Sequence, residues 1–448
     1  MSMRSVFALA IRCGLIGAAA AACYYSAVLA AAARLFEANT ADSVAAAVKL
    51  VPNNPRYLAR LAALEPDRKA ALLQRAVTLS PYDSDSWIQL GLSAEREHSD
   101  IKAAEADLLK AAAVDRTYLP RFTLAGFYAR RRMQPQFFRW ATTALEITPN
   151  SPEPVFEEMW RLSRSADRIS IAIPNRPAIL LQYTVFLTDA REFRAIPPVI
   201  SRLIGATTPK DAHKFGRDDL IAGIEDRLLA KNQAGPALTI WNAMQRGGWL
   251  HQGIISVDNP ITKGDFAVPF YGHGFDWRAA HEEAAISIDR YPGEKALRLT
   301  FAGDQPDHAV LLSRYVPVCP GREYRMNWQA SSQNISTPSG LSWRIRPFSD
   351  SAAQGVSSGD LFAPSPTWNF RTPPEADLCV LTLEYARPTG IDPIKREVRL
   401  RSVSMSARLS ISPPQSRILR TSRRSPRFRV LRNARCEWRL PTQDPHHA

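Results

Sequence analysis

The stretch Ala296-Leu297-Arg298-Leu299-Thr300-Phe301 alternates apolar and polar side chains, within the run Lys295–Phe301. Successive side chains of a β-strand point to opposite faces, so the pattern predicts a strand that buries Leu297, Leu299 and Phe301. From His251 onwards the chain is rich in Gly, Pro and aromatic residues, and similar runs recur. They are Ala285–Asp289, Ala309–Val318, Glu323–Ala330, Ser342–Arg346, Leu378–Tyr385 and Val398–Met405. Short strands separated by turn residues predict an antiparallel β-sandwich.

Specific phrases around these strands carry a resemblance to a known family. They are Gly264-Asp265-Phe266, Gly274-Phe275-Asp276-Trp277, "ALRLTF" at Ala296–Phe301, "PGREY" at Pro320–Tyr324, Trp368 with Phe370 and Thr372-Pro373, and "VRLRSVSM" at Val398–Met405. In this order they resemble the jelly-roll carbohydrate-binding modules of the CenC type, found on bacterial glycan-active enzymes. The resemblance covers roughly residues 261–407 and is more specific for the fold than for a ligand.

The resemblance implies that exposed aromatic side chains stack on sugar rings. The expected carbohydrate-binding residues are Trp277, Trp368, Trp328 and Tyr385. Trp343 is expected in the core, because it alternates with Leu341 and Ile345 on one face of a strand. Many modules of this shape bind no sugar and act as packing or docking domains, so that alternative stays open.

The segment from about Leu35 to Gly248 has helical periodicity and contains a repeat. Pro81, Asp115 and Pro149 are spaced by 34 residues. Before each lies a triplet at helical spacing: Lys69, Leu73 and Ala76; Ala104, Leu108 and Ala111; Phe137, Ala141 and Ala144. The pattern resembles the tetratricopeptide repeat family, a helix-turn-helix unit, and departs from it at Asp115, Ala94 and Lys69. The resemblance implies an α-solenoid whose concave face binds a protein partner.

After Ser151 the repeat weakens, although helices are still predicted. They cover Glu153–Arg164, Pro177–Thr188, Glu192–Ile204, Arg217–Ala230 and Gly235–Gln245. The predicted architecture is therefore multidomain α and β. It has an N-terminal membrane segment at 1–34, a helical repeat domain at 35–250, a β-sandwich at 251–410 and a basic tail at 411–448.

The N-terminal segment predicts a membrane anchor. Arg4 and Arg12 precede the uncharged run Cys13–Ala33, whose 21 residues span roughly 31 Å as a helix and match the apolar core of a bilayer. Because the basic residues come first, we expect a single-pass protein of a bacterial inner membrane with most of the chain on the periplasmic side. A cleaved signal peptide with a site near Ala30–Ala33 and a lipoprotein processed at Cys23 are the alternatives.

The cysteines and the charge add further expectations. Cys319 and Cys379 are the two cysteines of the predicted sandwich, and an oxidising compartment favours a disulfide between them. No Cys/His cluster has metal-ligand spacing, so no metal or cofactor is expected. The formal charge is +14, and the region from Ile411 to Ala448 accounts for half of it with nine arginines and two acids. This tail is predicted to be disordered, and no nucleic-acid-binding module is expected.

The sequence does not favour an enzyme. Glu282 and Glu283 are adjacent, and neighbours on a strand face opposite ways, so they cannot flank one glycosidic bond. We expect a membrane-anchored scaffold with a carbohydrate-binding-like module that assists exopolysaccharide, O-antigen or envelope assembly. The alternatives are a pure protein-binding scaffold and an accessory subunit of a glycan-active enzyme.

Overall fold

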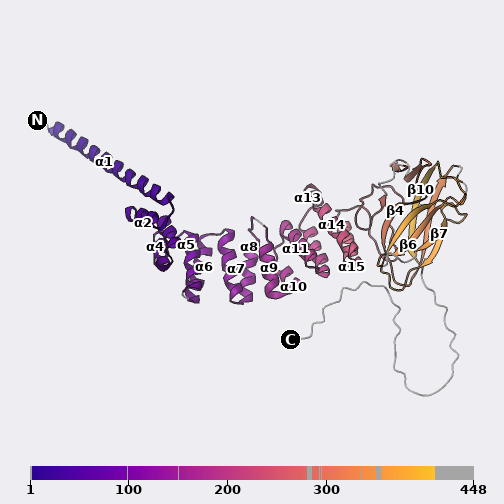
Figure 1. Ribbon diagram of the computed structural model, residues 1–448, viewed down its shortest axis with the longest axis horizontal. Coiled ribbons are helices and arrows are strands. Elements are labelled where there is room, and N and C mark those ends of the chain that lie inside the picture. The colour runs from indigo at the N-terminus through magenta and orange to yellow at the C-terminus, as the bar shows by residue number, and fades with distance from the viewer. Residues whose placement is uncertain are drawn as a thin grey trace, which may run out of the picture. The chain divides into compact units, whose positions relative to one another are not determined.

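The computed structural model describes residues 3–97, 99–149, 151–279, 285–291, 293, 295–333, 335, 337–349 and 355–408. Helices occupy the N-terminal part of the chain and strands the C-terminal part (Figure 1). Two compact units divide at Pro174, so that one comprises Met1–Pro174 and the other Asn175–Ala448. The predicted disordered tail from Ile411 and the acid pair Glu282-Glu283 lie outside the described residues.

The first unit consists of helices. They are α1 (Met3–Glu37), α2 (Ala41–Leu50), α3 (Pro55–Leu64), the 3-10 helix η1 (Pro66–Arg68), α4 (Lys69–Leu79), α5 (Ser84–Arg96), α6 (Ile101–Val114), α7 (Tyr118–Arg130), α8 (Gln134–Leu145), α9 (Glu153–Ser163) and α10 (Ala166–Ala172). Consecutive helices pack in pairs, α3 on α4, α5 on α6 and α7 on α8. The predicted triplets supply buried residues at these contacts, including Leu73, Leu108 and Ala141.

The contact between α5 and α6 depends on a residue without a side chain. A Cβ on Gly91 would lie 2.8 Å from Cγ of Leu108 and 3.1 Å from the carbonyl oxygen of Ala104. Two helix backbones approach this closely only where one of them carries a small residue. The absence of a side chain at Gly91 therefore lets α5 and α6 touch.

We predict that Gly91→Ala destabilises the α5–α6 pair. The overpacking costs about 1–3 kcal/mol, which exceeds the gain in helix propensity of about 1 kcal/mol. Gly126 in α7 is the matched control, because a Cβ there meets only Nη1 of Arg130, at 3.3 Å, and no neighbouring helix backbone. Hydrogen–deuterium exchange of α5 and α6 peptides should accelerate in Gly91→Ala and not in Gly126→Ala. Equal exchange in both variants would contradict the close-packing role.

The second unit begins with helices that the sequence assigned to the solenoid. They are α11 (Pro177–Asp189), η2 (Phe193–Ala195), α12 (Ile196–Gly205), α13 (Pro209–Lys214), α14 (Arg217–Ala230) and α15 (Ala234–Arg246). Hydrogen bonds join α15 to the segment that leads into the sheets. Nε1 of Trp241 donates to the Gly253 carbonyl at 3.2 Å, and the amide of Asn242 pairs with the backbone of Ile255 at 2.8 and 2.9 Å. These helices therefore group with the sheets, whereas the sequence placed a domain boundary at residue 250.

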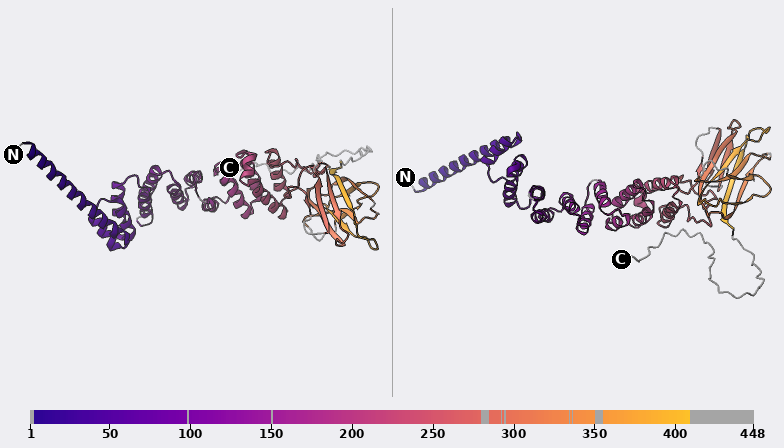
Figure 2. Two further views of the ribbon diagram at one scale, coloured as in Figure 1. Left: turned by 90° about the horizontal axis from the view of Figure 1, so that it is seen from above. Right: turned by 60° about the horizontal axis from the view of Figure 1, so that its bottom comes forward.

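The rest of the second unit is two five-stranded antiparallel sheets (Figure 2). The first has the order β1-β4-β9-β6-β7 and the second the order β2-β3-β10-β5-β8. The strands are β1 (Arg278–Ala279), β2 (Ile286–Tyr291), β3 (Ala296–Phe301), β4 (His308–Pro317), β5 (Glu323–Ser332), β6 (Leu341–Pro347), β7 (Val356–Asp360), β8 (Thr367–Arg371), β9 (Leu378–Ala386) and β10 (Glu397–Ala407).

One hydrophobic core joins the inner faces of both sheets. Leu297, Leu299 and Phe301 of β3 are buried in it, as their alternation predicts. The first sheet contributes residues such as Leu381 and Leu383. Strands β1 and β7 lie outside every predicted run, because their sequences, Arg278-Ala279 and Val356–Asp360, lack an apolar alternation. Strand β8 also lies outside those runs, although Trp368 and Phe370 alternate with polar residues in it.

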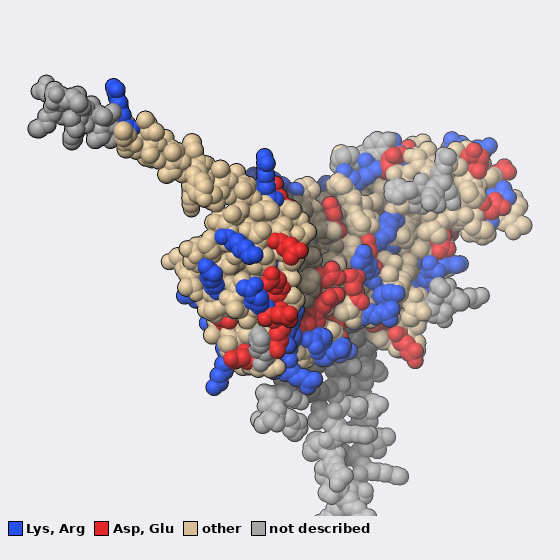
Figure 3. Space-filling view, turned by 60° about the vertical axis from the view of Figure 1, so that its left-hand side comes forward, with Lys and Arg blue, Asp and Glu red and all other residues tan. Residues whose placement is uncertain are grey.

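Helix α1 is long and apolar enough to cross a membrane. This part of the helix is Arg12–Glu37, which has 26 residues. Only 6% of its most apolar stretch is buried against the rest of the protein. A signal sequence near the N-terminus has the same properties. The space-filling view shows α1 as an almost uncharged rod that leads to a surface rich in charged side chains (Figure 3).

Candidate functional site

The exposed face of the first sheet carries a groove. Alternation along β4, β9 and β6 sends every second side chain to this face, and the strand register aligns them in rows. One row is Ser313, Thr382 and Arg344. The next is Tyr315, Val380 and Arg346. The groove encloses about 660 Å³ and is also lined by Arg278, Val310, Arg314, Pro347, Phe348, Gly355 and Glu384.

Basic and aromatic side chains dominate this groove. The guanidinium carbon of Arg278 lies 4.8 Å from the ring centre of Tyr315, whose ring meets that of Phe348 edge to face at 5.6 Å. Arg346 forms no ion pair within the described residues. Four arginines therefore line the groove against one carboxylate, that of Glu384. The planar guanidinium group matches carboxylate and phosphate oxygens.

Arg314 places a buried positive charge beneath the groove. Its side chain is 1% exposed, and burial lowers its pKa to about 10, which the nearby Asp276 carboxylate opposes. The guanidinium lies 5.2 Å from the Trp277 ring and donates to the Thr262 carbonyl at 3.0 Å. Since its pKa remains well above 7, Arg314 is charged at neutral pH and adds to the attraction for anions.

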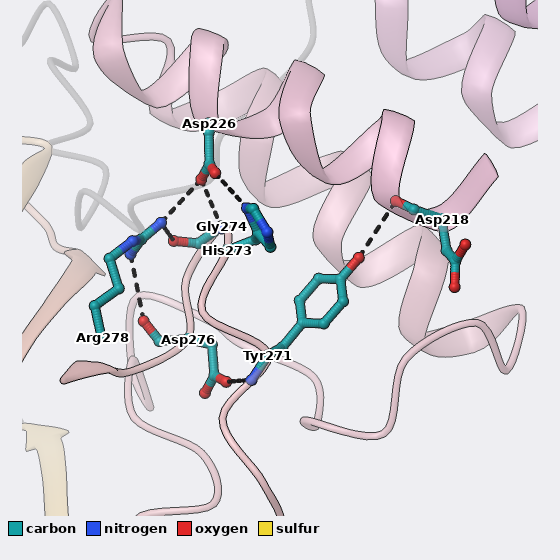
Figure 4. Close-up of polar contacts among 7 residues, drawn as sticks. All are labelled: Asp218, Asp226, Tyr271, His273, Gly274, Asp276 and Arg278. Carbon is teal, nitrogen blue, oxygen red and sulfur yellow. Dashed lines mark hydrogen bonds and ion pairs between the residues drawn. The ribbon is translucent and has the colours of Figure 1, made fainter. Parts of the chain in front are cut away.

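Arg278 is held at the rim of the groove by a polar junction with α14 (Figure 4). Asp226 on α14 accepts from Nη2 of Arg278 at 2.8 Å and from the Gly274 backbone N–H at 2.8 Å. Its other oxygen lies 2.7 Å from Nδ1 of His273. The same nitrogen of Arg278 also donates to the Gly274 carbonyl at 3.0 Å. These contacts fix the direction in which the Arg278 guanidinium points.

Glu225, beside Asp226, is a buried acid without a hydrogen-bond partner in the described part of the chain. Its carboxyl group packs against Gly274, where an added Cβ would lie 2.7 Å away. Burial raises the pKa of Glu225 well above its usual range, the negative charge of Asp226 adds to the rise, and Arg278 opposes it. Glu225 therefore favours its protonated, neutral form in the folded protein.

The four side chains predicted to stack on sugar are in the core. Trp277 and Tyr385 are 1% exposed, Trp328 3% and Trp368 9%, so none presents a ring face to solvent, and the expectation of stacking by these residues was wrong. Trp343 is buried, as predicted. The rings pack on one another and on their neighbours because two sheets of this size need large apolar side chains to fill the space between them.

The predicted disulfide between Cys319 and Cys379 is not formed, and this prediction was also wrong. Cys379 is a buried free thiol, and burial raises its pKa to about 12. It lies opposite Val316 in the strand register, three residues before Cys319. Three strand residues cover roughly 10 Å, whereas the Cα atoms of bridged cysteines lie about 4.4–6.8 Å apart. The structure thus excludes this pairing, while Cys319 itself is disulfide-bonded.

The groove residues Tyr315, Phe348, Arg278, Arg344 and Arg346 were missed by the sequence reasoning. A signal was available, because Tyr315 and Arg344 occupy polar-face positions of the predicted runs Ala309–Val318 and Ser342–Arg346. Within the described residues, no group of three or more His, Cys, Asp or Glu side chains could hold a metal ion.

No protein-family model matches the sequence, and no curated protein matches it. The solved structures with limited similarity include three complexes or domains of different kinds. Accessory secretory protein 1, 2 and 3 of Streptococcus pneumoniae is 13% identical, over 28% of this chain and 87% of that chain, with a TM-score of 0.21. A CBM4 structure is 16% identical, over 34% of this chain and 100% of that chain, with a TM-score of 0.24. Naa15/Naa10 bound to HypK-THB is 12% identical, over 49% of this chain and 39% of that chain, with a TM-score of 0.27.

We predict that Glu225→Gln stabilises the second unit at neutral pH. A folded-state pKa raised above the usual value of 4.5 means that the folded state holds a proton which the unfolded state releases. Stability therefore falls as the pH rises above about 4.5, and the variant escapes that loss. Calorimetric unfolding should coincide for both proteins near pH 4 and diverge by about 1–3 kcal/mol toward pH 8.

Asp226→Asn is the matched comparison for this pH series. It removes the charge that holds His273 and Arg278, so it should destabilise the unit at neutral pH while Glu225→Gln stabilises it. An unchanged pH dependence in Glu225→Gln would show that Glu225 is ionised in the fold.

Proposed function

We propose that the protein is a membrane-anchored, non-catalytic scaffold whose β-sandwich binds an acidic polysaccharide. The observation that carries this proposal is the groove on the first sheet, in which arginines surround the rings of Tyr315 and Phe348, the aromatic shelf. Uronate-bearing glycans combine the two features that the groove matches, carboxylates for guanidinium groups and apolar ring faces for Tyr315 and Phe348.

Polar groups in the groove suit sugar hydroxyls. Thr382 donates to Glu384 at 2.7 Å, and Glu384 also lies 3.4 Å from Nε of Arg344. A glycosidase needs two carboxylates on either side of the bond that it cleaves. Glu384 is the one carboxylate among the described lining residues and is held by Arg344, which supports binding over hydrolysis.

The paired helices of the first unit support a role in binding a protein partner. Their buried small residues fit the resemblance to tetratricopeptide repeats, and such repeats present an extended surface to other proteins. Together with a membrane segment and a glycan-binding groove, this organisation suits assembly of an exopolysaccharide, O-antigen or other envelope polymer. The proposed site of action is the periplasmic side of a bacterial inner membrane.

A second candidate is a scaffold whose sandwich contacts only protein. It is favoured by the burial of the side chains that were expected to stack on sugar rings, those of Trp277, Trp328, Trp368 and Tyr385. The two candidates differ in the ligand of the groove and share the membrane anchor. An accessory subunit of a glycan-active enzyme would use the same groove and is distinguished by its partner.

We predict that the full chain, purified in maltoside micelles, binds polygalacturonate or alginate and does not bind neutral dextran. Arg346→Gln should weaken binding by about 1.5–3 kcal/mol, because it removes a charged hydrogen-bond donor. Tyr315→Ala should weaken it by about 1 kcal/mol through loss of the shelf. Isothermal titration calorimetry measures both effects.

Arg325→Gln is the charge-matched control, since Arg325 is exposed on β5 in the other sheet. It should bind like the parent protein. An equal loss in Arg325→Gln would indicate general attraction between a basic protein and an anionic polymer. Absence of binding to any acidic glycan would favour the protein-only scaffold.

The proposed topology is tested by reporter fusions after Gly248. Because Arg4 and Arg12 precede the apolar run, alkaline phosphatase, which is active only outside the cytoplasm, should be active there. A reporter that folds only in the cytoplasm should be inactive at the same position. The opposite pattern would refute the periplasmic placement, and it would leave the insertion of α1 into the membrane to be tested separately.

A further inference from the structure

A second pocket, separate from the groove on the first sheet, lies at the C-terminal end of α1. It encloses about 430 Å³ and is lined by Ala33, Phe36, Glu37, Asn39, Arg56, Tyr57 and Arg60. These residues come from the last turn of α1, the turn after it, and the start of α3. All belong to the first unit.

Packing holds the walls of this pocket in place. Ala32, Leu35 and Phe36 of α1 contact a buried cluster that contains Ala47 of α2 and Tyr57 of α3. The rings of Phe36 and Tyr57 stack with their centres 4.7 Å apart. The end of α1 is therefore part of the body of the unit, and the pocket is preformed.

Two arginines give the pocket its charge. The guanidinium carbon of Arg56 lies 5.2 Å from the ring centre of Phe36, and Nε of Arg60 donates to Oδ1 of Asn39 at 2.6 Å. Neither guanidinium forms an ion pair with a carboxylate within the described residues. Glu37 is the single carboxylate among the residues that line the pocket, and Arg34, outside the lining, is a further basic residue in the last turn of α1. The pocket thus offers guanidinium N–H donors to an anion.

The position of the pocket along α1 matches a lipid headgroup. The uncharged run ends at Ala33, and Phe36 lies three residues further, a rise of about 4.5 Å. The headgroup region extends roughly 5–7 Å beyond the hydrocarbon on each side of a bilayer. With α1 across the membrane, Arg56 and Arg60 are therefore level with the lipid phosphates, and acyl chains can follow the apolar surface of α1.

We propose that this pocket binds the phosphate of an anionic phospholipid headgroup. The inference rests on the proposed membrane anchoring by α1. It does not depend on which side of the membrane the helical unit lies, because the pocket stays beside the end of α1 in either orientation. Binding there would fix the helical unit against the membrane surface and limit its rotation about α1.

The test uses the full chain in maltoside micelles, which contain no phosphate. Dihexanoyl phosphatidylglycerol, dihexanoyl phosphatidylcholine and inorganic phosphate are titrated separately and followed by ³¹P nuclear magnetic resonance. We expect phosphatidylglycerol to bind more tightly than either of the others. The double variant Arg56→Gln/Arg60→Gln should weaken that binding roughly tenfold to thirtyfold, since each basic residue near a membrane contributes about a factor of five.

Lys110→Gln/Arg116→Gln is the control, because it removes the same charge from exposed positions on α6 and the turn after it. It should bind phosphatidylglycerol like the parent protein. Equal weakening by the control, or no weakening by the pocket variant, would overturn the proposal. Equally tight binding of inorganic phosphate would overturn the assignment to a lipid.

Flotation with neutral phosphatidylcholine vesicles separates this proposal from the proposed anchoring. Parent, pocket variant and control should all float, because insertion of α1 needs no headgroup charge. A parent protein that floats without preference for phosphatidylglycerol contradicts the pocket and leaves the anchor intact. A parent protein that does not float contradicts the anchor, and the headgroup site with it.

Discussion

The arrangement of the second unit depends on the polar contacts of one carboxylate, that of Asp226. It lies on α14 and receives bonds from His273, the Gly274 backbone and Arg278, all in the segment that enters the first sheet. A single charged group that satisfies three donors is costly to remove, since each donor would lose a partner in a half-buried place. Because Arg278 also stacks on Tyr315, the same carboxylate sets the geometry of the groove rim.

The neighbouring acid, Glu225, lies in a very different environment. Glu225 is buried without hydrogen bonds, whereas Asp226, one residue later, is ion-paired. Adjacent residues on a helix point about 100° apart, so one side chain enters the packed interior and the other reaches the polar segment. The direction of each side chain therefore decides whether its carboxyl group is buried without a partner or paired with a cation.

The two faces of the first sheet have different roles: the inner face forms the core and the outer face carries the groove. The inner face takes the large aromatic rings, such as Trp343 and Tyr385, because the space between sheets has to be filled. The outer face keeps arginines and the smaller aromatic shelf of Tyr315 and Phe348. The proposed ligands of the groove and of the pocket at α1 are both anions, since both sites present guanidinium groups in excess of carboxylates.

The sequence determined the elements whose signals are local. Alternation in Ala296–Phe301 identified a strand and its buried face, and helical periodicity placed Arg217–Ala230 to the residue. The length of the uncharged run at Cys13–Ala33 identified a helix that can span a membrane. Each of these depends on neighbours within a few residues, which a sequence displays directly.

Only the tertiary structure decided which aromatic residues are buried and that Cys319 and Cys379 do not pair. Trp277 and Tyr315 are both aromatic residues near turns or strand ends, and their opposite fates depend on strand register and on which face meets the other sheet. A shift of one residue in register would exchange those faces. Pairings such as Asp226 with Arg278, 52 residues apart, follow from the packing of α14 beside β1. Such contacts join segments remote in the chain, so no local pattern of the sequence encodes them.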